Sequence, residues 1–289
     1  MKKAYKPKTL DEVLYLLDKY SENSEIIAGG TDIVIDLRNN KIVSDIMIDI
    51  TNIPYISHIV KKDGYIEIGG GTTFTQIAES KILGRKLMGL KKACSMVGSP
   101  QIRNRGTVGG NIINGSPAAD SVPPLIALDS EITLASINGE RTMKIEDYYL
   151  YKDELGIKNN EILTNIKFKA LKNDEAITFS KLGLRKALAI SRISMSIFLS
   201  LNEEKRCKDI RIVSGALGKF PMREREVEKV FVDKKIDEDL VCEGLKVLEG
   251  VLDNRLKGRP TLEYKRQAVK GLFIEAMEDG ERYFEEVIL

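Results

Sequence analysis

The stretch from Gly98 to Asp120 constrains the fold of this chain more than any other part of the sequence. It reads GSPQIRNRGTVGGNIINGSPAAD and holds five of the 23 glycines among small hydroxyl and amide side chains. Glycine has no Cβ and tolerates positive φ, so Gly106, Gly109 and Gly110 suit turns in which main-chain N–H groups converge on an anion. The stretch therefore predicts backbone that lies close to another group.

A second glycine turn occurs upstream, in the segment EIIAGGTDI from Glu25 to Ile33. This segment is typical of a short strand, a Gly-Gly turn and the start of a helix, a geometry that directs free N–H groups at a phosphate. Alone, Gly29 and Gly30 could form an ordinary strand-to-helix turn. With both loops present we expect one diphosphate to contact both. Because the Asp32 carboxylate would oppose a phosphate, we favour a capping role for Asp32 on the following helix.

Composition indicates a chain of ordinary globular type. Its 289 residues favour two domains, and a net charge of +2 with mixed signs argues against nucleic acid or an anionic membrane as a partner. No segment reaches the ~18 apolar residues of a membrane span. Asp11 and Glu12 interrupt the N-terminal apolar run, so we expect a cytoplasmic protein rather than a secreted one.

The scarcity of histidine and cysteine excludes several classes of site. Three separated cysteines without a CxxC spacing predict reduced thiols and no metal centre in this chain. His58 is the one histidine, so triads and multi-histidine metal sites are excluded, and we interpret His58 as structural. We expect no catalytic residue of these kinds here.

Hydrophobic periodicity and turn signals predict strands first and helices last, which is typical of an α+β fold. The expected helices are 9–20, 32–38, 82–97, 223–232, 237–252 and 261–277, with a further short one after Thr73. The expected strands are 25–28, 45–50, 57–61, 65–69, 132–137, 162–168, 193–201 and 210–217. Lys62-Asp63-Gly64 and Asn138-Gly139 mark hairpin turns.

Several ordered motifs together resemble a known family. They are AGGTD (28–32), GSPQIRNRGTVGGN (98–111), SPAAD (116–120), EILTNI (161–166), FSKLGLRKALAIS (179–191), SGALGKFPMR (214–223) and GRPTLEYKR (258–266). The chain resembles the FAD-binding medium subunit of the xanthine dehydrogenase and molybdenum hydroxylase family over nearly its whole length. The resemblance implies a PCMH-type FAD-binding domain over 1–172, with subdomains of about 1–55 and 56–172, and an α+β C-terminal domain over 173–289.

The resemblance also implies a set of FAD contacts. Beside the pyrophosphate and the dimethylbenzene edge it places Ile26, Ile27, Ala28, Gly29, Gly30, Thr31, Asp32 and Ile33. On the opposite side it places Thr107, Val108, Gly109, Gly110 and Asn111. Gly98 would leave space near the ring, Asp120 would accept hydrogen bonds from ribityl or ribose hydroxyls, and Leu163 would touch the flavin. Lys181, by itself a surface lysine, would lie near N1 and the C2 carbonyl and stabilise the reduced ring.

Partner subunits follow from the same resemblance. A large subunit would hold the molybdenum cofactor, a small subunit would carry two [2Fe-2S] clusters, and FAD in this chain would pass electrons to NAD or another acceptor. Two alternatives remain. The chain could be a self-contained flavin oxidoreductase of the same fold, although such enzymes often anchor flavin through a histidine near the first glycine loop, and His58 lies outside it. It could also be a flavin-free scaffold.

Overall fold

The computed structural model describes residues 3–185 and 188–287, and the chain forms two compact units. Unit 1 contains Met1–Ile82, Ser99–Asn114 and Ser130–Lys169, and unit 2 contains Leu83–Gly98, Gly115–Asp129 and Ala170–Leu289. Three sheets and the helices packed on them give an α+β architecture, as the sequence predicts.

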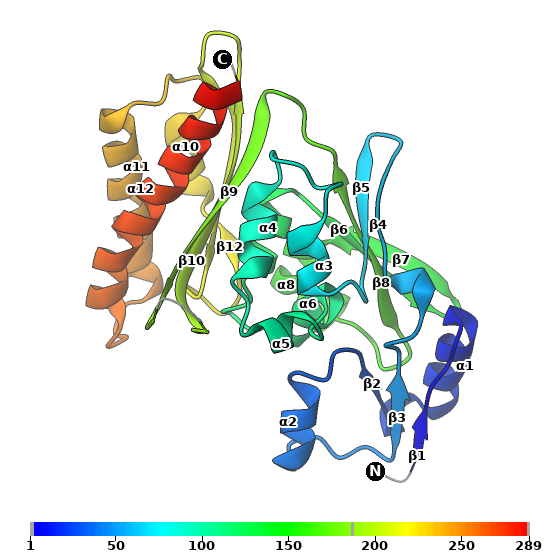
Figure 1. The fold of residues 1–289 in the computed structure, drawn as a ribbon. Helices are drawn as coiled ribbons and strands as arrows, with labels where there is room; N and C mark the ends of the chain where they lie inside the picture. The colour runs from blue at the N-terminus through cyan, green and yellow to red at the C-terminus, as the bar shows by residue number, and fades with distance from the viewer. Residues whose placement is uncertain (1–2, 186–187, 288–289) are drawn as a thin grey trace. The chain divides into compact units, whose positions relative to one another are not determined.

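Unit 1 begins with a small parallel sheet in the order β1-β3-β2 (Figure 1). Its elements are β1 (Lys3–Tyr5), α1 (Leu10–Tyr20), β2 (Ser24–Ile27), α2 (Ile33–Arg38) and β3 (Ile46–Asp49). Thr9 caps α1, because its hydroxyl accepts a hydrogen bond from the Glu12 N–H at 3.2 Å. The predicted strand, helix and strand around the first glycine turn are confirmed, with Ile26 of β2 opposite Ile48 of β3.

A five-stranded antiparallel sheet in the order β4-β5-β8-β6-β7 forms the larger part of unit 1. Its strands are β4 (Ile59–Lys62), β5 (Tyr65–Gly69), β6 (Glu131–Ser136), β7 (Gly139–Lys144) and β8 (Ile162–Lys169). Asp63 and Gly64 adopt φ of 51° and 79°, which confirms the predicted tight hairpin turn. His58 Nδ1 donates a hydrogen bond to the Tyr55 carbonyl at 2.9 Å, which fits its structural interpretation.

Short helices connect these strands and carry the glycine-rich segment. They are η1 (Ser21–Asn23), η2 (Pro54–Ile56), α3 (Phe74–Glu79), α5 (Pro100–Arg103), α6 (Val108–Asn114), α8 (Ile145–Leu150) and α9 (Lys152–Leu155). A reciprocal pair of hydrogen bonds caps α3, in which the Gln76 N–H donates to Thr73 Oγ1 and the Thr73 N–H donates to Gln76 Oε1.

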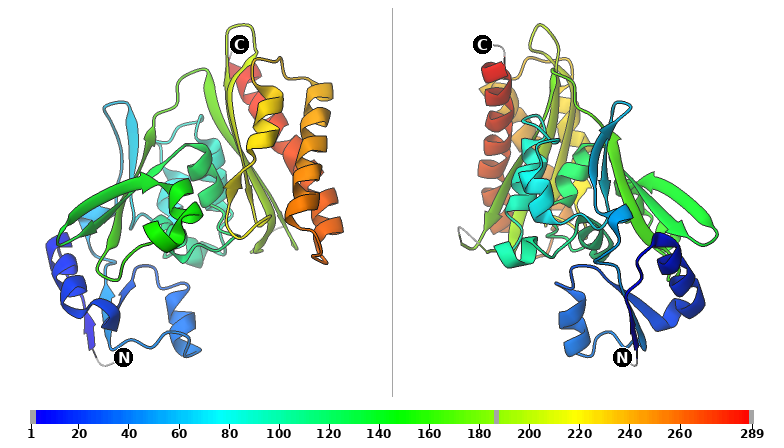
Figure 2. Two further views of the ribbon diagram at one scale, coloured as in Figure 1. Left: turned by 180° about the vertical axis from the view of Figure 1, so that it is seen from behind. Right: turned by 45° about the vertical axis from the view of Figure 1, so that its right-hand side comes forward.

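Unit 2 is built on the antiparallel sheet β12-β11-β10-β9. Its strands are β9 (Glu175–Gly183), β10 (Ser191–Leu201), β11 (Cys207–Gly215) and β12 (Met222–Arg223). Its helices are α4 (Met88–Ser95), α7 (Val122–Ala127), α10 (Arg225–Phe231), α11 (Glu238–Arg255) and α12 (Leu262–Val287). In both views of Figure 2 the last three helices stay together along the sheet, where Phe231, Leu248 and Phe273 form a buried core with Ile197 and Ile212.

One predicted helix is shorter than expected. The sequence predicts a helix from residue 82, but α4 begins at Met88, because Gly84 adopts a φ of 49° that interrupts the helical path. All three cysteines are free thiols, and burial raises the pKa of Cys207 to about 12. Among residues 3–185 and 188–287, no helix is long and apolar enough to span a membrane and no acidic, cysteine or histidine cluster could hold a metal.

Candidate cofactor-binding site

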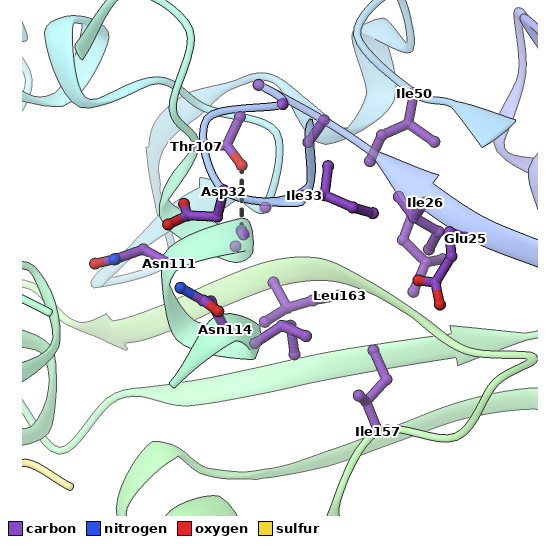
Figure 3. Close-up of a pocket in the computed structure, with 18 of the residues that line it drawn as sticks. Glu25, Ile26, Asp32, Ile33, Ile50, Thr107, Asn111, Asn114, Ile157 and Leu163 are labelled. Carbon is purple, nitrogen blue, oxygen red and sulfur yellow. Dashed lines mark hydrogen bonds between the residues drawn. The ribbon is translucent and has the colours of Figure 1, made fainter. Parts of the chain in front are cut away.

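A cavity of about 400 Å³ lies within unit 1 (Figure 3). Three stretches of chain provide most of its lining: the turn after β2, the turn into α6, and the loop before β8 together with the first residues of that strand. The two glycine loops that the sequence singles out therefore line one cavity.

The turn after β2 offers unused hydrogen-bond donors. Within residues 3–185 and 188–287, no acceptor is found for the main-chain N–H groups of Gly30, Thr31 or Asp32, which line the cavity. Gly30 adopts a φ of 73°, a conformation that glycine reaches at little cost, and the turn redirects the chain from β2 into α2. A row of unpaired N–H groups beside a cavity is suited to the oxygens of a phosphate.

Close backbone contact joins the two glycine loops. A Cβ on Gly29 would overlap the carbonyl oxygen of Arg105 and would lie 2.8 Å from Cα of Gly106. Likewise, a Cβ on Gly109 would lie 2.5 Å from the carbonyl oxygen of Gly70. These glycines are therefore required for space, because the atoms they meet belong to the main chain and cannot rotate away.

The structure corrects the expected role of the second loop. The N–H groups of Gly106, Val108, Gly109 and Gly110 do not converge on the cavity, because each already has an acceptor in the protein. Val108 donates to the Thr72 carbonyl at 3.0 Å, Gly109 to the Gly70 carbonyl at 2.9 Å, and Gly110 to Thr107 Oγ1 at 3.1 Å. Gly106 donates to the Ile102 carbonyl at 2.7 Å, and none of these glycines has positive φ. These four residues of the second loop supply a closely fitted wall, whereas Gly30, Thr31 and Asp32 of the first loop supply free donors.

Asp32 also differs from its expected role. It precedes α2 as the N-cap residue, but its carboxylate caps no N–H group of that helix. The Thr31 hydroxyl donates to Asp32 Oδ2 at 3.2 Å instead, and the Asp32 side chain lies on the same side of the cavity as Thr107 and Asn111 (Figure 3). Because Asp32 is exposed, solvent screens the repulsion between its carboxylate and a bound anion.

The other end of the cavity contains residues that sequence reasoning missed. Glu25, Ile26, Ile50 and Ile157 lie together at this end (Figure 3), and of these only Ile26 was predicted. Burial raises the pKa of the half-buried Glu25 carboxyl. No motif marks Ile50 or Ile157, since each is one apolar residue near the end of a strand or loop. For Glu25 a signal exists, because its alternation with Ile26 on an edge strand places the two side chains on opposite faces.

Three predicted residues lie in unit 2, where two of them form a buried polar cluster. Lys181 Nζ donates to Asp120 Oδ2 at 2.5 Å and to the Met96 carbonyl at 3.0 Å, and the Ser191 hydroxyl donates to Asp120 Oδ1 at 2.5 Å. The two charged side chains are only 4% and 6% exposed. Burial raises the pKa of Asp120, while the Lys181 ammonium and the Ser191 hydroxyl oppose this shift.

The predicted residues thus separate into three groups. Those that line the cavity are Ile26, Ala28, Gly29, Gly30, Thr31, Asp32, Ile33, Thr107, Gly109, Gly110, Asn111 and Leu163. Ile27 and Val108 are not lining residues; the Ile27 side chain packs against Gly30, and Val108 is fully buried. Gly98, Asp120 and Lys181 belong to unit 2. Lys186 and Ala187, within the motif at 179–191, lie outside the described residues.

Two family models match the chain. Residues 1–168 match the FAD binding domain in molybdopterin dehydrogenase, and residues 178–279 match the CO dehydrogenase flavoprotein C-terminal domain. The first match alone covers more than half of the 289 residues. Residues 169–177 lie between the two matches.

Similar proteins agree with these matches. The chain is 33% identical to the nicotinate dehydrogenase FAD-subunit of Eubacterium barkeri, over 93% of this chain and 92% of that one. It is 31% identical to the xanthine dehydrogenase FAD-binding subunit of Escherichia coli O157:H7, over 76% of each chain. In fold it is similar to carbon monoxide dehydrogenase from Hydrogenophaga pseudoflava, with a TM-score of 0.89 at 22% identity over 98% of both chains.

Proposed function

The chain belongs to the family of FAD-binding medium subunits of xanthine dehydrogenase and carbon monoxide dehydrogenase, and from this membership we propose that it is the electron-transfer subunit of a molybdenum-dependent hydroxylase. Bound FAD would supply two-electron redox chemistry that connects two [2Fe-2S] clusters of a small partner subunit with NAD or another acceptor. A large partner subunit would hold the molybdenum cofactor and a substrate of the N-heterocycle, purine or aldehyde type. This chain then needs no general acid or base.

One observation supports this proposal above the others. The unpaired N–H groups of Gly30, Thr31 and Asp32 line a cavity whose adjoining wall is the closely fitted second glycine loop. A dinucleotide with a diphosphate at its centre matches this arrangement, because the diphosphate oxygens need donors and the flanking groups need apolar walls such as Ile33 and Leu163. A flavin-free scaffold would have no use for an unpaired row of donors.

The residues of this chain would bind and orient the cofactor. Main-chain N–H groups of the first loop would hold the diphosphate without needing a charged side chain. The second loop packs closely against Gly29 and Gly70 and would keep water away from the bound diphosphate on that side. Leu163, at the start of β8, would pack against the ligand. Because these walls rest on strands and on main-chain contacts, the cofactor would be held in one orientation.

The test is an absorbance spectrum of the purified chain before and after addition of FAD. We expect bands near ~370 and ~450 nm, which belong to oxidised flavin. The proposal further requires that a pull-down from the native host yields two partner subunits with molybdenum and iron. A chain that stays colourless and takes up no FAD would rule out the proposal and leave the scaffold alternative.

The assignment of Lys181 to the flavin is a prediction with its own test. An ammonium has three N–H donors, and two of those on Lys181 are used by Asp120 and the Met96 carbonyl, so one donor is left for a further acceptor. We expect Lys181→Ala to lower the reduction potential of bound FAD by about 30 mV or more, which for two electrons corresponds to about 1.4 kcal/mol.

Spectroelectrochemical titration measures this potential. Lys229→Ala, which removes an exposed lysine paired with Glu226, serves as the control and should leave the potential unchanged. An equal potential in Lys181→Ala and the wild type, with FAD bound in both, would remove Lys181 from the proposed role.

A further inference from the structure

The loop before β8 forms one wall of the cavity, and an arginine outside the cavity holds this loop. Ile157, Lys158, Asn159 and Glu161 line the cavity, whereas Arg141 of β7 does not. The loop follows α9 and contains no regular element of its own, so its shape depends on contacts with its surroundings. Arg141 supplies four of these contacts.

The guanidinium of Arg141 bonds to both ends of the loop. Its Nε and Nη2 donate to the two carboxylate oxygens of Glu161, each at 2.7 Å. Nη1 donates to the Leu155 carbonyl at 3.1 Å and Nη2 donates to the Gly156 carbonyl at 2.8 Å. A planar fork of donors fixes geometry as well as charge, so this arrangement holds residues 155 and 161 at a set separation.

Glu161 extends the same network into the loop. Its Oε2 also accepts the N–H of Lys158 at 2.8 Å, and its side chain is only 7% exposed. Burial raises the pKa of the Glu161 carboxyl, but the Arg141 guanidinium and the Lys158 N–H lower it by more, so the pKa lies below its ordinary value. The carboxylate is therefore charged at neutral pH, and losing Arg141 would leave a buried charge without its partner.

The end of the cavity beside this wall suits the adenosine half of FAD. Glu25 lies there with Ile26, Ile50 and Ile157, on the opposite side from Asp32 and Thr107 (Figure 3). Among residues 3–185 and 188–287 the Glu25 carboxylate has no hydrogen-bond or ion-pair partner. A carboxylate can accept the exocyclic amine of adenine, whereas beside the flavin it would repel the negative charge that reduction places on N1 and O2.

We propose that Arg141 is a positioning residue for FAD binding, which acts by holding the wall at 155–161 against the adenosine half of the cofactor. This inference rests on the proposed function, since it requires that the cavity binds FAD. Arg141 does not line the cavity and would not touch the ligand itself. Its effect reaches the ligand through Glu161 and through the carbonyls of Leu155 and Gly156.

The experiment compares FAD, ADP and FMN binding by calorimetry in the wild type and in Arg141→Met. ADP keeps the adenosine and the diphosphate, and FMN keeps the flavin without the adenosine. We expect the Kd values of FAD and ADP to rise together by about tenfold, while the Kd of FMN changes by less than about twofold. Arg141→Lys keeps the charge but not the planar fork of donors. Its Kd values for FAD and ADP should lie between those of the wild type and those of Arg141→Met.

The matched control is Lys167→Met, which breaks the Lys167–Glu67 pair on the same sheet at a site that does not line the cavity. It should leave all three Kd values unchanged. If Arg141→Met does not fold, Arg141→Lys and Glu161→Gln decide the question by the same comparison. Equal weakening of FMN and ADP, or an unchanged ADP affinity, would overturn the inference. A wild-type chain that does not bind FAD would instead overturn the proposed function.

Discussion

Gly29→Ala is expected to weaken FAD binding strongly. The new methyl group would overlap the main-chain carbonyl of Arg105 and approach Cα of Gly106 to 2.8 Å, so the two glycine loops would have to separate. Forced overpacking of this kind costs about 1–3 kcal/mol, and because Gly29 and Gly106 line the cavity, we expect the FAD affinity to fall by about a hundredfold. Flavin fluorescence quenching on titration with FAD measures the change.

A glycine in an open position provides the control for this substitution. A Cβ on Gly271, inside α12, would meet no atom within 4 Å. Gly271→Ala should therefore leave FAD binding unchanged and raise stability slightly, by about 0.5–1 kcal/mol, because alanine loses less backbone entropy in a helix. Wild-type FAD affinity in Gly29→Ala would contradict the close contact between the two loops.

Arg255→Met is expected to cause a large loss of stability in unit 2. Glu224, just before α10, is 2% exposed. Its two carboxylate oxygens accept hydrogen bonds from Arg255, one from Nη1 at 2.7 Å and one from Nη2 at 2.8 Å. The Ser214 hydroxyl of β11 also donates to Glu224 Oε1, at 2.5 Å. Without Arg255 the carboxylate stays buried with its charge uncompensated, so we expect the free energy of unfolding to fall by about 3–5 kcal/mol.

Urea unfolding followed by circular dichroism measures this loss. Lys229→Met breaks the pair of Lys229 and Glu226, whose side chains are 69% and 64% exposed, and should cost no more than about 1 kcal/mol. The double variant Arg255→Met with Glu224→Gln should recover part of the loss, because it removes the unpaired charge. A single Arg255→Met variant as stable as the exposed-pair control would show that the buried pair contributes nothing measurable.

Local signals in the sequence predicted most elements correctly. Thr9, Thr73 and the Asp63-Gly64 pair define caps and a turn through atoms within a few residues of one another, so neighbouring side chains suffice to predict them. The strand β9 was missed because residues 176–180 are buried on both faces, so the strand shows none of the alternation that marks a half-exposed strand.

The sequence alone determined the two glycine loops, the strand and helix that flank the first one, and the family of the chain. These features depend on side-chain size and on backbone freedom, which are properties of short segments. Only the tertiary structure decided which N–H groups stay free for a ligand, because Thr72 and Gly70 supply the acceptors that occupy Val108 and Gly109. It also paired Arg141 with Glu161 and Asp120 with Lys181, since such partners are set by the path of the chain and not by spacing along it.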